Sequence, residues 1–312
     1  MLVVGSVNRD HVCRVEALPA PGETVLGGEA SVGSGGKGGN QAVAASLLGA
    51  RTALVARVGD DSDGHALTAD LAEAGMDITE VVATVVRTGL AFVFVDAHGE
   101  NSIVVAPGAN ALLDPASVED AVRRRLAPSG VLVTQAEIPV AAFDAAIRTA
   151  AEAGCRAVVN LAPYRPVDEA VLALCDPLVV NESEASGLLG REVRGASAAR
   201  DAAADLLRLC RSVVVTVGGE GAVVADADGV QVAAAPHVEV VDSTGAGDAF
   251  IGAMAAALSA GHGLPAAVLI AVRAGAHAVT RPGAQASFAS AETLGIAPLR
   301  PSPRGEAPTV VR

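Results

Sequence analysis

The chain has 312 residues, 51% of them hydrophobic, and a formal net charge of −13. This length and composition exclude a disordered protein and allow a sizeable core. The acidic charge disfavours nucleic acid and anionic membrane surfaces as partners, and no apolar run is long enough to cross a bilayer. An apolar run, "MLVVGS", opens the sequence without a basic region before it. We therefore expect a cytoplasmic protein.

Short apolar runs alternate with helical patterns along most of the chain. The predicted strands are residues 2–5, 52–58, 130–134, 157–160, 178–180 and 212–217. The predicted helices are residues 40–48, 64–74, 117–126, 141–153, 182–189 and 198–209. This order predicts an α/β fold with a central, mostly parallel sheet flanked by helices, in which ligands bind at the carboxyl ends of the strands.

Two segments, about 11–32 and 81–106, show residue alternation and turn signals but no helical pattern. The second predicts two strands around a turn at residues 98 and 99. We expect these segments to form a small β-sheet lid inserted into one α/β domain of residues 1–297. A lid with an apolar face needs a partner surface, so a homodimer through the lid is expected. Residues 298–312 are proline-rich and predict a flexible tail.

A glycine-rich stretch, residues 31–50, leads from the first lid segment into the first predicted helix. It contains six glycines and Lys37, the only lysine of the chain. A compact ammonium group suits an anion or a sugar, although a drift of the other basic residues toward arginine also explains a single lysine. We expect the glycines to let the backbone approach a ligand.

The pattern G-x-G-x-x-G at Gly33, Gly35 and Gly38 leaves a dinucleotide-dependent oxidoreductase open as an alternative. Asp60 or Asp61 would then contact the ribose of the dinucleotide. However, the stretch does not directly follow the first strand, and a lysine and an asparagine stand where close apolar packing is expected. A nicotinamide fluorescence titration would decide between the two readings.

The strongest signal is "VVDSTGAGDAFIGAMAAAL", residues 240–258. Apolar residues recur at helical spacing after Gly247, so a buried helix begins near Gly245. We expect the free N–H groups of Gly245, Ala246 and Gly247 to form an anion hole. Asp248 would take a proton from an attacking hydroxyl during phosphoryl transfer. An acid that only complements the helix dipole is the alternative.

Several motifs together resemble one family. They are "GSVNRD", "PGET", "GSGGKGGNQA", "VGDDSDG", "PGAN", "VVNESEAS" and "DSTGAGDAF". In order and approximate spacing they are similar to motifs of the ribokinase family of sugar kinases, over about residues 1–290. The resemblance implies a ribokinase-like fold with a β-lid, often dimerised through that lid. It also implies ATP- and Mg²⁺-dependent phosphorylation of a sugar hydroxymethyl group.

Asn8 and Asp10 follow the first predicted strand, and period-2 alternation points both to one side and Arg9 to the other. An amide and a carboxylate suit sugar hydroxyls, which donate and accept hydrogen bonds. A turn at the strand end is the alternative. The resemblance implies a sugar site formed by these two residues with Gly36, Lys37, Asn40, Glu137 and Asp248.

Asn181 and Glu184 form an N-x-x-E element after a predicted strand. The resemblance implies that this pair organises Mg²⁺ and its waters near the phosphates, while an N-terminal capping box is the structural alternative. On the ATP side, the resemblance implies contacts from Asn181, Thr216, Gly218, Gly221 and Gly247. A tight turn after a strand also explains the glycines at 218 and 221.

A monovalent cation such as K⁺ is a further implication of the resemblance. The residues matching such a site are Asp242, Thr244, Ala278, Arg281, Gly283 and Ser287, several of them through backbone carbonyls. The chain departs from the family pattern at "NLAP", residues 160–163, where "NPAP" is usual. It also carries Val272 and Arg273 where Asn or His often lies near the adenine.

D-ribose, phosphorylated at its 5-hydroxyl, is the expected substrate. A nucleoside kinase would need aromatic surfaces to stack the base, and aromatic residues make up only 2% of the chain. A sugar phosphate would need extra cations, and alternation turns Arg9 away. Another pentose, including deoxyribose, remains open, as do a nucleoside and a sugar phosphate. A sugar sensor on the same fold would need neither Asp248 nor the Gly-Ala-Gly turn before it.

Overall fold

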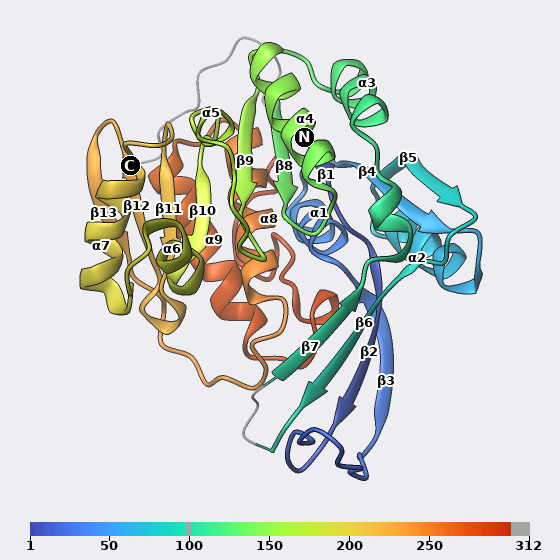
Figure 1. The fold of residues 1–312 in the computed structure, drawn as a ribbon. Helices are drawn as coiled ribbons and strands as arrows, with labels where there is room; N and C mark the ends of the chain where they lie inside the picture. Colours follow the sequence, from blue (N-terminus) through green and yellow to red (C-terminus); the bar gives the residue numbers. More distant parts are fainter. Residues whose placement is uncertain (98–100, 301–312) are drawn as a thin grey trace.

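A nine-stranded sheet forms the centre of the molecule (Figure 1). In spatial order its strands are β13 (Gly229–Ala233), β12 (Ala222–Asp226), β11 (Val213–Thr216), β10 (Leu178–Asn181), β9 (Arg156–Asn160), β8 (Val131–Gln135), β1 (Leu2–Val4), β4 (Ala53–Gly59) and β5 (Asp77–Thr84). Strands β11 to β5 are parallel, and β12 and β13 extend the sheet as an antiparallel hairpin. The computed structural model describes residues 1–97 and 101–300.

Helices cover both faces of the sheet. One layer contains α1 (Lys37–Leu47), α2 (Ser62–Glu73), α8 (Ala246–Ser259) and α9 (Leu264–Ala278), and the other contains α3 (Pro115–Arg125), α4 (Val140–Glu152), α5 (Glu169–Leu172), α6 (Glu182–Leu189) and α7 (Gly195–Leu206). Along β1, Val3 packs on the first layer while Leu2 and Val4 pack on the second. Strands buried on both faces explain the continuous apolar runs. The predicted α/β fold class is therefore confirmed.

Four strands form a separate small sheet that projects from the main body (Figure 1). In order they are β3 (Ala30–Gly35), β2 (Asn8–Arg14), β6 (Gly89–Val95) and β7 (Asn101–Ala106). Only the β2–β6 pair is parallel. The predicted lid segments need correction at their edges, because β2 already pairs from Asn8, and residues 81–84 belong to β5, which pairs with β4 in the main sheet. The turn predicted at residues 98 and 99 lies outside the described residues.

The chain stays packed through residue 300. Leu299 is buried against the main core, and its N–H donates to the carbonyl of Leu48 at 2.7 Å. The first three residues of the predicted tail therefore belong to the folded domain, and residues 301–312 lie outside the described part. Across the described residues, no helix is long and apolar enough to cross a bilayer.

Helix α1 begins at Lys37, three residues before the predicted start. Gly36 has φ of 82° and turns the chain from β3 into the helix. A Cβ on Gly38 would lie 2.6 to 2.7 Å from backbone atoms of Gly5 and Ser6. Gly38 is therefore part of the helix, because only glycine lets this first turn approach the end of β1 so closely.

Gly252 plays a comparable role where α1 packs on α8, and its replacement gives a stability prediction. A Cβ at Gly252 would lie 2.5 Å from the carbonyl oxygen of Gln41 and 2.6 Å from the Cβ of Ala44. We expect Gly252→Ala to lower the free energy of unfolding by about 1–3 kcal/mol in urea titrations. Gly39→Ala, whose Cβ meets its nearest atoms at 3.8 Å, is the control and should be neutral or stabilising. Equal stability of both variants would contradict this packing.

Candidate active site

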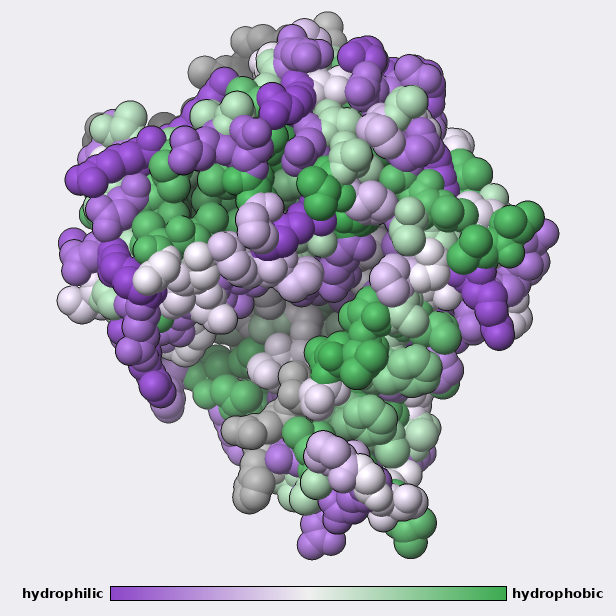
Figure 2. All heavy atoms as spheres, viewed as in Figure 1, coloured by the Kyte–Doolittle hydropathy of each residue, from purple (hydrophilic) through white to green (hydrophobic). Residues whose placement is uncertain are grey.

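The carboxyl ends of four neighbouring strands face the small sheet across a cleft of about 450 Å³. Figure 2 shows the surface hollowed between the main body and the small sheet. The predicted site residues that line this central cleft are Asn8, Asp10, Gly36, Lys37, Asn40, Glu137, Asn181, Glu184, Thr216, Thr244, Gly245, Gly247 and Asp248. The structure thus brings the predicted sugar, magnesium and base residues together, as expected for ligands of parallel sheets.

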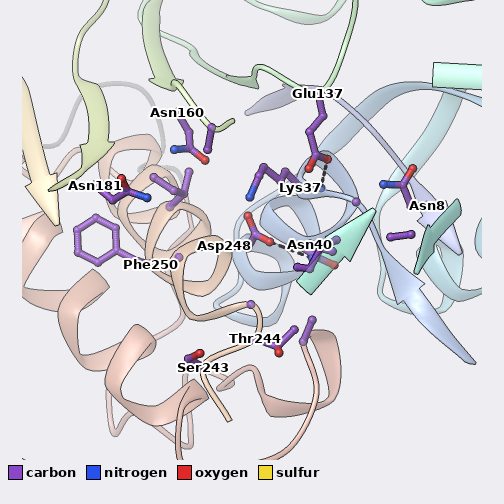
Figure 3. Close-up of a pocket in the computed structure, with 18 of the residues that line it drawn as sticks. Asn8, Lys37, Asn40, Glu137, Asn160, Asn181, Ser243, Thr244, Asp248 and Phe250 are labelled. Atoms are coloured by element: carbon purple, nitrogen blue, oxygen red, sulfur yellow. Dashed lines mark hydrogen bonds between the residues drawn. The ribbon is translucent and has the colours of Figure 1, made fainter. Parts of the chain in front are cut away.

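Asp248 lies in the first turn of α8 and points into the central cleft (Figure 3). The residue is 8% exposed. Its Oδ2 accepts a hydrogen bond from Asn40 Nδ2, and its Oδ1 accepts one from Gln41 Nε2, both at 2.9 Å. Each carboxylate oxygen keeps a second lone pair. The carboxylate is therefore held from the α1 side and can still accept a proton.

The N-terminus of α8 is shaped by Gly245, which caps the helix with φ of 76° and no side-chain hydrogen bond. The N–H of Ala246 was predicted to be free, but it donates to the Ser243 carbonyl at 3.3 Å. Within the described residues, the N–H groups of Gly245, Gly247 and Asp248 have no acceptor. The candidate anion site therefore shifts to these three groups.

Lys37 reaches into the central cleft beside Asp248 (Figure 3). Burial alone would lower the pKa of Lys37, but the carboxylates of Asp248, Glu137, Glu184 and Asp10 raise it above its ordinary value. The ammonium group therefore stays charged and offsets part of the negative charge in the cleft.

Glu137 ties the start of α1 to β1. Its Oε2 accepts hydrogen bonds from Ser6 Oγ at 2.5 Å and from the backbone N–H of Lys37 at 3.1 Å. A carboxylate at this helix N-terminus is favoured by the helix dipole. Glu137 thus has a structural role at the edge of the cleft besides the sugar contact expected of it.

Asn8 and Asp10 lie on β2 and both line the central cleft, as the alternation predicted. Arg9 points the other way, with Nη1 3.5 Å from Asp70 Oδ2. Burial, then the charges of Glu137 and Asp248, raise the pKa of Asp10 to about 7. Its Oδ1 is buried without a hydrogen-bond partner in the described part of the chain. An uncompensated acceptor of this kind is a favourable place for a ligand hydroxyl.

The two glycines directly before Lys37 are required by protein atoms more than by a ligand. A Cβ on Gly35 would lie 2.0 Å from Oδ2 of Asp10, and one on Gly36 would lie 2.7 Å from backbone atoms of Val7 and Asn8. The expectation that these glycines chiefly admit a ligand to the backbone is therefore revised. They make room for β2 and for the Asp10 carboxylate, and Gly36 also lines the cleft.

Asn181 and Glu184 form a complete capping box at the start of α6. Asn181 Oδ1 accepts the N–H of Glu184, and Glu184 Oε2 accepts the N–H of Asn181, both at 2.8 Å. Burial raises the pKa of Glu184, and the N–H of Asn181 and the charge of Lys37 oppose this shift. Both side chains also line the cleft, so the cap and a ligand-binding role coexist.

A second pocket of about 340 Å³ adjoins the central cleft. It is lined by Thr216, Gly218, Gly221, Ala246, Gly247 and Val272, with Val238, Val240, Phe250 and Val279. Thr216, Gly247 and Phe250 also line the cleft. Of the predicted ATP-side residues, Thr216, Gly218, Gly221 and Gly247 are thus gathered in one apolar pocket, whereas Asn181 lines the central cleft. Arg273 does not line this pocket, and its guanidinium donates to the Leu294 carbonyl.

Thr244 and Gly283, two of the residues predicted for a monovalent cation, lie against Asp242. Asp242 accepts the N–H groups of Thr244 at 2.9 Å and Gly283 at 2.8 Å. Although burial opposes the shift, these hydrogen bonds hold the pKa of Asp242 below its ordinary value. Ser287 is fully buried, and its hydroxyl donates to the Ala284 carbonyl.

The other two residues predicted for the cation site are Ala278, the last residue of α9, and Arg281, three residues after it. There the Ala278 carbonyl accepts the N–H of Arg281 at 3.3 Å. Among the residues that the structure describes, no group of three acidic, histidine or cysteine residues is arranged to hold a metal.

Four amide side chains near Asp248 carried no role in the sequence-level prediction. They are Gln41, Gln135, Asn160 and Gln285. Asn110, in the quoted motif "PGAN", also had none. Its amide bonds Asn8 Oδ1 at 2.8 Å and the backbone of Val7. Gln41 and Asn110 lie in quoted motifs, which was the available signal for these two, but motif membership does not say which atoms meet.

The comparisons with known proteins can now be set against this geometry. Residues 1–291 match the family described as pfkB family carbohydrate kinase. The chain belongs to the pfkB family of carbohydrate kinases. A pfkB carbohydrate kinase is a phosphotransferase that acts on an alcohol group of a sugar. The match therefore confirms the predicted enzyme class and the resemblance to the ribokinase family.

Individual relatives of this pfkB-family kinase include ribokinases. The chain is 35% identical over 290 residues to ribokinase from Haemophilus influenzae, covering 92% of this chain and 94% of the relative. Ribokinase from Thermotoga maritima superposes with a TM-score of 0.84 at 32% identity, covering 94% and 97%. Arabidopsis thaliana ribokinase complexed with ribose and ATP gives 0.82 at 28% identity, covering 94% and 96%.

The dinucleotide alternative does not agree with this fold. Gly33 and Gly35 lie in β3 of the small sheet and not in a turn between a strand and a helix of the main sheet. Asp61 caps α2 by accepting the N–H of Gly64 at 2.8 Å. The G-x-G-x-x-G spacing is therefore coincidental in this pfkB-family kinase.

Proposed function

We propose that this chain is a ribokinase, which transfers the γ-phosphoryl group of ATP to the 5-hydroxyl of D-ribose. The observation that carries the proposal is the placement of Asp248, a buried carboxylate that lines the central cleft beside N–H groups without acceptors and follows Gly247, which lines both the cleft and the apolar pocket. Relatives and solved neighbours named as ribokinases support ribose as the sugar.

The residues divide the proposed reaction between them. Ribose would lie in the central cleft against Asn8, Asp10 and Lys37. Asp248 would accept the proton of the 5-hydroxyl as its oxygen attacks the γ-phosphorus of ATP. The N–H groups of Gly245 and Gly247 would then donate to the oxygens of the transferred phosphoryl group, where negative charge gathers in the transition state.

The second pocket suits the nucleotide. Its walls are largely apolar, and the glycines at 218 and 221 leave the backbone accessible at the end of β11. An adenine ring would therefore pack between aliphatic side chains, with Val272 where some relatives of the family place an amide or imidazole. ATP as the phosphoryl donor rests on this pocket and on the neighbour solved with ATP.

Magnesium fits the donor set of the capping box. One oxygen of Glu184 accepts the N–H of Asn181, the other has no hydrogen-bond partner among the described residues, and the residue lines the cleft. Mg²⁺ retains several waters and needs few protein carboxylates, so Glu184 with Asn181 would hold it through water. The ion would neutralise charge on the ATP phosphates.

A monovalent cation such as K⁺ would lie beside Asp242. The carboxylate is ionised and each of its oxygens keeps a lone pair after accepting Thr244 or Gly283. We propose carbonyl ligands from Ala278, Arg281, Gly283 and Ser287 around it. The cation would stabilise the turn before α8, because Asp242 accepts the N–H of Gly283 and Gly245 packs closely on Ala284.

We further propose that the small sheet is the lid of residues 1–297 and joins two copies of the chain. One face of the sheet lines the cleft through Ala91, Val93 and Val105. The opposite face carries the exposed side chains of Val32, Phe92 and Val104, with Phe92 stacked on His11. Hydrophobic residues gather on the small sheet in Figure 2. Such a patch on a short sheet is typical of a protein interface.

A coupled assay of ADP release tests the proposed function. Ribose, deoxyribose, fructose, adenosine and fructose 6-phosphate would each be supplied with ATP and Mg²⁺, with and without K⁺. We expect the highest kcat/KM with ribose and a further increase with K⁺. A higher kcat/KM with any of the other acceptors would contradict the assignment.

The pH dependence of ribose binding follows from Asp10. With a pKa of about 7, its carboxylate is mostly protonated below that pH and then loses acceptor capacity for a sugar hydroxyl. We expect the KM for ribose to fall roughly tenfold between about pH 6 and pH 8 at saturating ATP. Asp10→Asn should raise KM and remove this dependence. A wild-type KM that does not change with pH would rule out the assignment.

A further inference from the structure

Gln41 is fully buried on the side of α1 that faces α8. Its Nε2 donates to Asp248 Oδ1 at 2.9 Å and to Asn160 Oδ1 at 3.1 Å, and its Oε1 accepts from Gln135 Nε2 at 2.7 Å. Both donors of the amide and its oxygen are thus engaged. Unlike Asp248 and Asn160, Gln41 does not line the central cleft.

The orientation of this amide follows from its partners. An ionised carboxylate only accepts hydrogen bonds, so the Nε2 of Gln41 must face Asp248. Its oxygen then faces Gln135, whose Nε2 supplies the matching donor at the end of β8. Gly5 leaves room for this chain of amides, because a Cβ there would lie 2.1 Å from Gln135 Oε1.

The second carboxylate oxygen of Asp248 also accepts a hydrogen bond from α1. Asn40 Nδ2 donates to Oδ2, and Asn40 Oδ1 in turn accepts from Gln285 Nε2 at 2.9 Å. Both carboxylate oxygens therefore receive one donor from neighbouring residues of α1. The difference is exposure: Asn40 lines the cleft and would meet a sugar, whereas Gln41 is enclosed by protein.

We infer that Gln41, itself oriented by Gln135, is a positioning residue that fixes the Asp248 carboxylate for proton transfer. The inference rests on the proposed function for its kinetic readout. When the sugar hydroxyl attacks phosphorus, its proton passes to a lone pair of Asp248 that neither Gln41 nor Asn40 occupies. The two donors keep that lone pair directed into the cleft, and a base misplaced by about 1 Å loses on the order of 10²-fold in rate.

Gln41→Met removes the hydrogen bonds while keeping an unbranched side chain of similar length. We expect kcat to fall about 10- to 100-fold, the scale of a hydrogen bond to a charged group. The KM values for sugar and ATP should stay within about threefold, because only the reacting geometry changes. Gln135→Met should lower kcat in the same sense by about 3- to 10-fold. The control is Thr52→Val, which changes a buried polar side chain directly before β4, away from the carboxyl ends of the strands. It should leave kcat unchanged.

A double-mutant cycle separates positioning from general damage. In an Asp248→Asn background, Gln41→Met should change the residual kcat by less than about threefold, since there is no base left to orient. Wild-type kcat in Gln41→Met, or an equal loss with and without Asp248, would overturn the inference. If Gln41→Met does not fold, the Gln135→Met cycle decides by the same criterion.

Failure of the proposed function is distinguishable from failure of the inference. If the wild-type enzyme phosphorylates none of the sugars, the proposed function is wrong. The crystal structure of Gln41→Met then still tests the inference without any substrate. We expect the Asp248 carboxylate to rotate away from the orientation that Asn40 and Gln41 share in the parent. An unchanged carboxylate would overturn the positioning role.

Discussion

Asp248→Asn is expected to lower kcat by about 10²- to 10⁴-fold, the usual contribution of a general base. The amide is nearly isosteric with the carboxylate but cannot take the proton of the sugar hydroxyl. Binding of ribose should change little, because the sugar contacts proposed for Asn8, Asp10 and Lys37 remain. Initial-rate kinetics give kcat, and isothermal titration with ribose gives its affinity.

The control for this variant is Asp114→Asn. Asp114 caps α3 and lies 3.3 Å from Arg57, outside the central cleft. Asp114→Asn should lower the free energy of unfolding and leave kcat unchanged. If Asp248→Asn retained wild-type kcat, the base assignment would be wrong. A variant that failed to bind ribose would instead assign Asp248 to substrate binding.

Lys37→Met should lower kcat/KM by about 10²- to 10³-fold, comparable to the loss of one preorganised charge-stabilising group. Removing the ammonium leaves the carboxylates of Asp10, Glu137 and Asp248 without their common counter-charge. The γ-phosphate of ATP would then approach a more negative cleft, so its KM should rise as well. Steady-state kinetics with ribose and ATP varied separately measure both effects.

Lys37→Arg is the matched variant, because it keeps the charge but is larger and planar. The pKa of Lys37 lies above its ordinary value, so its side chain stays charged across the neutral pH range. Activity of Lys37→Met close to wild type would show that the charges in the cleft are balanced without it. Full activity of Lys37→Arg would show that charge alone is required.

Most of the parallel strands of the main sheet could be predicted because they are short apolar runs that alternate with helical patterns. The hairpin β12–β13 and helix α9 were not predicted, although "DADG" carries an Asp-Gly turn signal between alternating runs. An antiparallel hairpin can extend a parallel sheet only beside an edge strand that has no other neighbour, here β11. That information is tertiary and not local.

The boundary of the small sheet illustrates the same limit. Residues 81–84 were assigned to the lid from their alternation, but together with residues 77–80 they form β5, which pairs with β4 at the edge of the main sheet. Sequence alternation reports one buried and one exposed face. It does not report which of two sheets the strand joins.

Some residues of the candidate site could be predicted from the sequence and others could not. Asn8, Asp10 and Asp248 could be placed from strand ends and helix starts, because these positions converge in a parallel sheet. Gln41 could not, since its partners are 94, 119 and 207 residues away along the chain. Only the close packing of α1 on α8 brings its amide to the carboxylate. Likewise, the hydrogen bond of Ala246 to Ser243 depends on the local turn and not on residue type.

The single lysine of this chain has a practical consequence. An isotope label confined to lysine marks one side chain, and that side chain lines the central cleft. Its single NMR signal would report occupancy by sugar or nucleotide without any turnover. One labelled residue can therefore rank ligands for this protein, including those that bind and are never phosphorylated.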